Sequence, residues 1–533
     1  MPISSSSVFE IRSTATASNV NGGFFVTGAS GTDFSQQDAA QFALTGVTSA
    51  GAGNEILSAS AAASMVGNGI KVVSGTNFTT GWFEITAVTP GVSITCSTNQ
   101  AGASISIGVG ASGVMNVGGA LSLGHTSDDS VFENAVSTNP GIVFWIKNGT
   151  YTLGSTVSIG SVGTSILHHR IIGYATTRGD NPVGSTRPTL ASGAAIFTLG
   201  NFWDLRNVIL TGTASPLLQP GSGSRIINNK IVNSSITADR AAVGAGNNMF
   251  IFRNELISYR GYGVSSNTLA AMVYCNFIHS SKVGIHNFAA GNPSNYSGNI
   301  VASCVTAAIQ FTNSATEFNL IERNTLYGSK NTTGIGVSFA AGVTNANLVN
   351  NIIYGFTTGV SHGAANTCVD DFNDYFNNDT DVTNWTKGSN DVAIDPAFVG
   401  VNQVTGSTAT TSGSVLTQAG ADFTASGVVA GRDYIYLVSG TGITAGIYGI
   451  TAVGTTTLTL DIAPGTNATA DKVFQITTGQ DFSIAGALGV GYPGSFPGGY
   501  TIGSADMGAV TTDPEVSSSG SIGGSSLGTM GFS

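Results

Sequence analysis

The chain has 533 residues, of which 41% are hydrophobic and only 9% are charged, and its formal net charge at pH 7 is -11. An acidic chain without a Lys/Arg cluster is poorly suited to neutralising phosphates, so we expect no nucleic-acid partner. No uninterrupted apolar run reaches the roughly 18 residues of a membrane helix, and the first residues lack a basic stretch followed by an apolar core. We therefore expect neither a membrane segment nor a secretory signal. The 73 glycines and many Ser, Thr, Asn, Val and Ile residues indicate an all-β chain with tight turns.

Residues 1–44 are expected to form an extended segment, followed by a small β-module at 45–115. Within that module, VSGTNFTTGWFEITAV runs from Val73 to Val88 and recurs 365 residues later as VSGTGITAGIYGITAV, from Val438 to Val453. Ten of the 16 positions are identical. Both copies alternate apolar and polar residues between glycine-containing turns, which predicts a small barrel or sandwich of antiparallel strands.

Residues 116–400 show a weaker periodicity when segments are aligned on an asparagine followed two residues later by an apolar residue. Spacings of 22 to 27 residues separate the eight asparagines, which are Asn207, Asn229, Asn254, Asn276, Asn299, Asn324, Asn351 and Asn373. Three apolar columns accompany them, which predicts three short strands per coil and a roughly triangular solenoid. Stacking coils place like residues on like and create one continuous core.

Asparagine suits the bend of each coil because it tolerates a left-handed backbone and its amide both donates and accepts hydrogen bonds. Stacked asparagines can then bond from coil to coil, as in other side-chain ladders. We interpret all eight as scaffold residues and not as ligands.

The coils and their asparagines resemble the right-handed parallel β-helix of the pectin-lyase-like superfamily. The segment IVFWIKNGTYTL from Ile142 to Leu153 resembles the opening coil of that family, and DDSVFENAVS from Asp128 to Ser137 resembles its capping helix. DPAFVG from Asp395 to Gly400 resembles the closing signature, together with DFSI at Asp481 and ADMGAV at Ala505. The resemblance implies the fold and leaves the function open.

The closing signature is split, so residues 401–479 are expected to be an insertion that holds the second β-module. Residues 480–512 would then close the β-helix, and residues 513–533 form a Gly/Ser-rich tail. The predicted fold class is all-β: a right-handed, single-stranded parallel β-helix with two small antiparallel modules. Modules at the ends of a rod could cap its exposed strand edges or serve as attachment domains.

Sugar-cleaving chemistry on such a scaffold needs paired carboxylates or an acidic calcium site with a basic residue. Glu255, Glu317 and Glu322 share no column, so we assign no catalytic residue and no cofactor. The densest acidic group, VDDFNDYFNND, contains Asp370, Asp371 and Asp374 as weak metal-ligand candidates. Its spacing is not that of an EF-hand loop, so we expect a solvated turn and no metal.

A second weak constellation is the run His168, His169 and Arg170. A tandem histidine pair without a carboxylate close in sequence is more typical of a surface or cap than of a general base.

The two modules and the opening segment resemble uncharacterised proteins of tailed bacteriophages. That resemblance implies a structural virion protein at the particle surface: a head fibre, a capsid decoration or a tail-spike-like appendage. It further implies a homo-oligomer, a trimer in appendages of this type, in contact with other virion proteins and with host polysaccharide as a ligand. Two alternatives stay open. The chain could be a polysaccharide lyase or glycoside hydrolase, although the sequence leans towards a non-enzyme, or a bacterial surface adhesin.

Overall fold

The computed structural model describes residues 5–15, 20–99, 101–123, 132, 141–160, 163–266, 271–288, 293–313, 318–328, 334–364, 368–398 and 400–482. Regular structure in these ranges is almost entirely strand, which confirms the all-β prediction. Two short 3-10 helices occur, η1 (Ala63–Met65) and η2 (Gly184–Thr186). Across the described ranges no helix is long and apolar enough to cross a membrane. The expected capping helix lies outside these ranges except for Phe132, as do Glu317 and residues 483–533.

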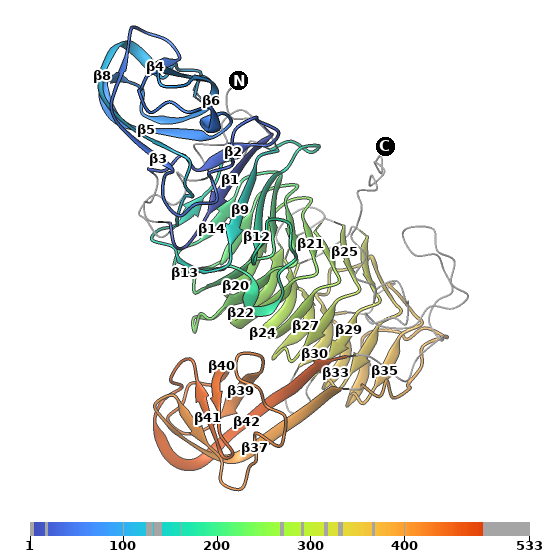
Figure 1. The fold of residues 1–533 in the computed structure, drawn as a ribbon. Coiled ribbons are helices and arrows are strands. Elements are labelled where there is room, and N and C mark those ends of the chain that lie inside the picture. Colours follow the sequence, from blue (N-terminus) through green and yellow to red (C-terminus); the bar gives the residue numbers. More distant parts are fainter. Residues whose placement is uncertain are drawn as a thin grey trace.

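A long β-helix forms the body of the molecule (Figure 1). Its coils stack three parallel strand faces, which we call face 1, face 2 and face 3. Face 1 consists of β1 (Ser7–Ile11), β9 (Val143–Lys147), β12 (His169–Tyr174), β15 (Trp203–Arg206), β18 (Arg225–Ile227), β21 (Phe250–Phe252), β23 (Met272–Tyr274), β25 (Ser294–Ser297), β28 (Asn319–Glu322), β31 (Ala346–Val349) and β34 (Val369–Asp371), with β2 (Phe24–Val26) added antiparallel to β1.

Faces 2 and 3 belong to one hydrogen-bonded sheet because two long strands, β22 (Glu255–Ser266) and β24 (Phe277–Asn287), run through both. Face 2 also holds β10 (Thr150–Thr152), β13 (Thr189–Gly193), β16 (Ile209–Gly212), β19 (Lys230–Asn233), β26 (Ile300–Ala302), β29 (Thr325–Tyr327), β32 (Ile352–Tyr354) and β35 (Asp374–Phe376). Face 3 also holds β11 (Val157–Ser158), β14 (Phe197–Leu199), β17 (Leu218–Pro220), β20 (Ala241–Ala245), β27 (Ala307–Phe311), β30 (Ile335–Phe339), β33 (Thr358–His362) and β36 (Thr380–Thr383).

The core follows from the alternation of side chains along each short strand. On face 1 one column points inward through successive coils, and its members include Ile226, Ile251, Val273, Tyr296, Ile321 and Leu348. All six are fully buried in one apolar cluster that continues along the rod. The stacked columns confirm the predicted parallel β-helix.

The first residues depart from the expected extended segment. Strand β1 pairs in parallel with β9, so Phe9 stacks on Phe144 and the chain begins the rod before it enters the first module. The bridge from Ile11 to Leu121 then closes the loop around that module. The first module is therefore itself an insertion between two strands of face 1.

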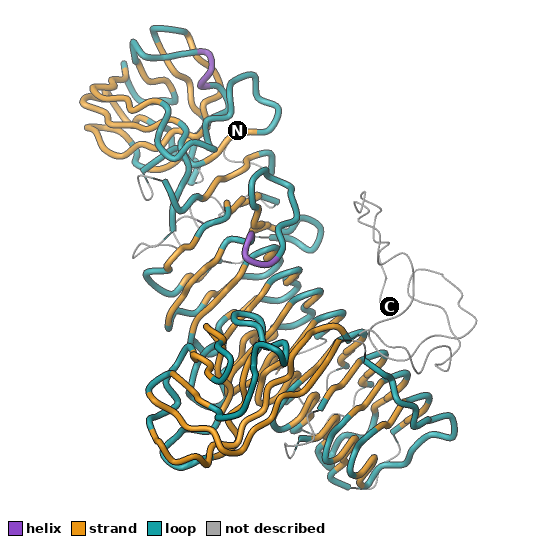
Figure 2. The backbone as a smooth tube through the Cα atoms, turned by 60° about the horizontal axis from the view of Figure 1, so that its bottom comes forward, coloured by secondary structure: helices purple, strands orange, loops and turns teal. Residues whose placement is uncertain are grey.

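Each module is a closed six-stranded barrel (Figure 2). The first consists of β3 (Phe42–Ser49), β4 (Glu55–Leu57), β5 (Gly69–Phe78), β6 (Gly81–Thr89), β7 (Ser93–Cys96) and β8 (Ser106–Val117). The second consists of β37 (Gly400–Ser412), β38 (Val415–Thr417), β39 (Tyr434–Ser439), β40 (Gly446–Val453), β41 (Thr457–Leu460) and β42 (Asn467–Asp481). The strand orders β3-β4-β7-β6-β5-β8 and β37-β38-β41-β40-β39-β42 are equivalent, which confirms a duplicated barrel.

Both barrels contact the rod through the same face. In the first, Trp82 of β6 joins the rod core, and its Nε1 donates to the carbonyl of Asn21 at 2.9 Å. Its counterpart 365 residues later is Ile447 of β40, which packs on Ile257 and Tyr259 of the rod. The pairing partners of these residues, Lys71 and Tyr436, are likewise equivalent.

The barrels nevertheless occupy different places on the rod. The first lies at the end formed by β1 and β2, whereas the second lies alongside β22 and β24 (Figure 1). Of the two modules, only the first is placed where it could cap an end. The second covers the outer side of face 2 in the middle of the rod.

Candidate functional site

Seven asparagines form a continuous hydrogen-bonded ladder at the corner between faces 1 and 2. The backbone N–H and Nδ2 of each donate to Oδ1 of the next, as Asn276 does to Asn299 at 3.0 Å for both bonds. Each Nδ2 also donates to a carbonyl of the preceding coil, for example that of Ile251 at 2.9 Å from Asn276. The rungs are Asn229, Asn254, Asn276, Asn299, Asn324, Asn351 and Asn373. Every rung is therefore hydrogen-bonded to the coils on either side of it.

Asn207 lies one residue out of this column. Val208 occupies the rung position, where its N–H donates to Oδ1 of Asn229 at 3.1 Å, and Asn207 aligns with Asn228. Asn207 has the left-handed φ of 59°, and in later coils that conformation falls on the residue before the rung, such as Arg253 and Arg323. The bend therefore precedes the ladder asparagine, contrary to our expectation that the asparagine itself makes it.

Asp370 is the one of the three acidic candidates that lies in the inward column of the core. It follows Leu348 in the inward column of face 1 and is only 6% exposed. Its carboxylate accepts hydrogen bonds from Oη of Tyr375 and Nε1 of Trp385, both at 2.7 Å, and from Nδ2 of Asn373. Burial, with the nearby Asp391, raises its pKa to about 7. Asp370 thus joins the last rung to the aromatic residues that end the core.

The other two acidic candidates point elsewhere. Asp371, on the outer side of face 1, accepts from the N–H and Nδ2 of Asn390, each at 3.0 Å. Asp374, on the outer side of face 2, accepts the N–H of Ile394 at 2.8 Å, and burial raises its pKa to about 7. The three carboxylates do not converge. Over the described ranges no three His, Cys, Asp or Glu side chains gather as they would around a metal ion.

The junction between the second barrel and face 2 holds another carboxylate. Glu255 lies between Nζ of Lys230 at 2.8 Å and Nε2 of His279 at 3.3 Å. Burial alone would raise the pKa of Glu255, but His279 and Lys230 lower it to about 2. A carboxylate held ionised in this way is a poor proton donor at neutral pH.

The barrel leaves little space at this junction. Two crevices lined by Ser280, Ser303 and Tyr434 each have a free volume of about 20 Å³. That volume holds a water molecule but not a sugar ring. The junction is therefore a packed interface between barrel and rod.

A basic cluster lies on the outer side of face 1, near the N-terminal end of the rod. Asp204 is buried and accepts from Nε of Arg225 at 2.7 Å, Nη2 of Arg206 at 2.6 Å and Nδ1 of His168 at 2.8 Å. Burial would raise the pKa of Asp204, but these partners lower it. Arg170, paired in register with Asp204, is exposed. Two guanidinium groups thus bind one carboxylate, and a third, that of Arg170, belongs to the neighbouring strand.

The same face continues from this cluster into aromatic residues. Phe250 follows Arg225 in register, and its ring centroid lies 5.4 Å from Phe252 and 5.7 Å from Tyr274. All three rings are partly exposed, and Met272 beside them is 38% exposed.

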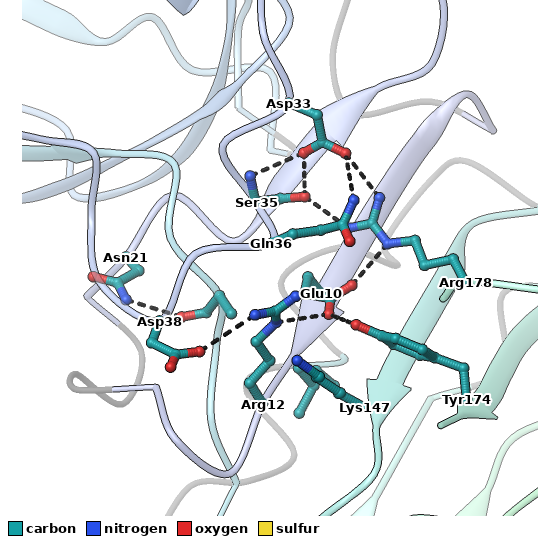
Figure 3. A network of polar contacts seen from close by, with 12 residues as sticks. Glu10, Arg12, Asn21, Asp33, Ser35, Gln36, Asp38, Lys147, Tyr174 and Arg178 are labelled. Carbon is teal, nitrogen blue, oxygen red and sulfur yellow. Dashed lines mark hydrogen bonds and ion pairs between the residues drawn. The ribbon is translucent and has the colours of Figure 1, made fainter. Parts of the chain in front are cut away.

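A further charged network fixes the start of the rod (Figure 3). Glu10 of β1 is fully buried and accepts from Nε of Arg178 at 2.7 Å, Nε of Arg12 at 3.0 Å and the hydroxyl of Tyr174. Arg178 also pairs with Asp33, in the loop that leads to the first barrel, at 2.9 Å. Glu10 thus joins β1 to Tyr174 and Arg178 of the next coils, and Arg178 joins them to the loop at Asp33, so the network is structural.

The asparagine register does not reveal the basic cluster, because it begins only at Asn207. The inward column of face 1 nevertheless contains a sequence signal for the cluster. Ile171, Leu205 and Ile226 are inward residues on successive coils, and each is preceded by a charged residue. Extending that column back by two coils would have aligned Arg170, Asp204 and Arg225.

No protein-family model matches the chain, and no curated protein matches it. Similar solved structures include a double mutant of the tailspike protein of E. coli bacteriophage HK620, 10% identical, covering 64% of this chain and 82% of that one, with a TM-score of 0.26. ORF18 of Geobacillus virus E2 is 10% identical, and the match covers 64% of this chain and 74% of that one, with a TM-score of 0.23. The tailspike gp49 of Pseudomonas phage LKA1 is 10% identical, and the match covers 83% of this chain and 82% of that one, with a TM-score of 0.16.

The strand pairing of the chain itself establishes the fold. The protein is a parallel β-helix that carries two copies of one six-stranded barrel.

Proposed function

We propose that the protein is a non-enzymatic structural component of a bacteriophage particle, exposed on the virion surface as a head fibre, a capsid decoration or a tail-spike-like appendage. The observation that carries this proposal is that the acidic residues have structural roles. Asp370 closes the core, Asp371 holds a turn and Glu255 pairs with two cations at the barrel junction. These carboxylates maintain the shape of the rod and form no catalytic pair.

The phage assignment within this proposal is supported by the likeness of the modules and opening segment to uncharacterised proteins of tailed phages. In that role the chain assembles as a homo-oligomer, a trimer, and contacts other virion proteins. Its ligand is host-surface polysaccharide, a polymer that an elongated rod can bind along its side.

Imaging of native particles tests the proposal. Antibodies against the rod should label purified particles of the phage that encodes this sequence, and sizing of the purified protein should give an oligomer. A monomeric protein absent from particles would contradict the proposal. Recovery in a bacterial envelope fraction would favour the surface adhesin instead.

The depolymerase alternative has a separate test. Wild-type protein is incubated with bacterial capsular and pectic polysaccharides, beside the variants Asp370→Ala, Asp371→Ala and Asp374→Ala, whose folding is checked by circular dichroism. We expect no release of oligosaccharides by any of the four proteins. Cleavage by the wild type that a folded variant has lost would establish a lyase or hydrolase.

A further inference from the structure

We propose that the outer side of face 1, from β12 to β23, is a binding site for an acidic polysaccharide. Guanidinium groups around Asp204 would bind its carboxylates, and the neighbouring aromatic rings would contact its sugar faces. This inference rests on the proposed function, in which the rod binds polysaccharide, and it specifies the class of polysaccharide and the site. β9, β12, β21 and β25 follow one another along one flank of the rod (Figure 1).

The guanidinium groups have unused capacity for an anion. Both oxygens of Asp204 are already occupied, Oδ1 by His168 and Arg225 and Oδ2 by Arg206. Three guanidinium groups against one carboxylate leave an excess of two positive charges, in a chain whose net charge is -11. Such a local reversal of sign favours an anionic partner.

Arg170 offers an anion a guanidinium without an ion pair in the described ranges, whereas the free donor of Arg206 is enclosed. Within the described part of the chain, the buried Nε of Arg206 has no hydrogen-bond partner. Over the same ranges no ion pair involves Arg170, which is exposed and in register with Asp204. A carboxylate can accept two parallel N–H bonds from one guanidinium, so it suits the exposed Arg170.

The aromatic rings extend the site along the rod. Phe250 lies one coil beyond Arg225, and Tyr274 lies one coil beyond Phe252. Arg253 lies 4.9 Å from the Phe252 ring centroid. Amphipathic aromatic surfaces next to charged groups suit ligands that combine apolar faces with polar edges, as sugars do.

The length of the site favours a polymer over a small anion. Five successive strands of face 1 carry it, and at about 4.8 Å per coil they span roughly 20 Å, which is more than a small ion needs. A single-stranded nucleic acid is also a polyanion with flat rings, and a DNA oligomer in the test below distinguishes it from a polysaccharide.

The test measures binding of four acidic polymers: polygalacturonate, alginate, hyaluronate and polysialate. Methyl-esterified polygalacturonate, which lacks the charge but keeps the rings, is the neutral control. We expect binding of at least one acidic polymer at 50 mM salt and at least tenfold weaker binding of the ester. Arg170→Gln should bind severalfold more weakly with an unchanged melting temperature. The double variant Arg170→Gln/Arg225→Gln should bind about tenfold more weakly and melt at a lower temperature, because the buried Asp204 loses its bond from Arg225. Tyr274→Ala should weaken binding severalfold.

Lys282→Gln is the matched control, because Lys282 pairs with Asp239 and lies on β24, away from face 1. This variant should bind like the wild type. The inference would be overturned if none of the four polymers bound, or if the Lys282 and arginine variants lost binding equally. It would also be overturned if a single-stranded DNA oligomer bound as tightly as the polysaccharides and depended on the same arginines. Particle labelling is read separately, so an unlabelled particle counts against the proposed function and not against this site.

Discussion

At the scale of single residues, Asp370 makes the stability of the rod depend on pH. Its folded pKa of about 7 lies above the ordinary value near 4, so the native state holds a proton that the unfolded chain releases. The stabilisation is complete below about pH 4 and is lost as pH rises to about 7. We expect the free energy of unfolding to fall over that window, by at most about 4 kcal/mol from this group. Denaturant unfolding at several pH values measures it.

Asp374 titrates in the same window, so Asp370→Asn should remove only part of the dependence. Asp371→Asn changes the adjacent carboxylate, which binds Asn390 at the surface, and serves as the control. We expect the control to keep the wild-type slope between pH 4 and pH 7. Equal slopes for wild type and Asp370→Asn would refute the role given to Asp370.

At the scale of elements, the asparagine ladder ties each coil to two neighbours, so a central rung should matter most. Asn299→Ala removes the acceptor for two donors of Asn276, both at 3.0 Å, and leaves buried polar groups unpaired. We expect a loss of about 2–4 kcal/mol in the free energy of unfolding.

A thermal melt compares this variant with Asn148→Ala, an exposed asparagine outside the ladder. The control should change the melting temperature by less than about 1 °C, because an exposed side chain away from special features contributes little. If the two variants melted alike, the ladder would not be a source of stability.

The ladder also shows how far the sequence alone could lead. Asparagine spacing predicted the coil period and seven of the rungs, because each rung requires the same side chain. It misplaced Asn207, because the bend residue and the rung residue are neighbours and both can be asparagine. Contacts between distant segments, such as Arg260 with Tyr448 at 3.0 Å, leave no periodic trace, so the docking of the second barrel could not be predicted. The basic cluster does follow the coil period, and the column of Ile226 leads to it when it is extended towards the N-terminus.

At the scale of the whole molecule, one barrel face has been adapted to two sites on the same rod. Gly69 of the first barrel lies so close to Gly22 that a Cβ there would overlap a backbone carbonyl. The equivalent Tyr434 of the second barrel instead packs on Tyr259, with ring centroids 5.9 Å apart. Small residues let the first barrel join the end of the rod closely, whereas larger ones fill the flank in the second. Duplication therefore preserved the docking face and changed its side chains.

Undocking the second barrel tests this account. Ile447→Asp places a charge against Ile257 and Tyr259 in the buried junction, where desolvation is unfavourable. We expect the barrel to stay folded, because Ile447 lies outside its own core cluster, and to detach from face 2. Hydrogen exchange should rise at least about tenfold in residues 255–259 and remain slow in the barrel. Val429→Asp, an exposed position on the same barrel, should change neither region. Protection retained at 255–259 in Ile447→Asp would show that the junction does not depend on this shared face.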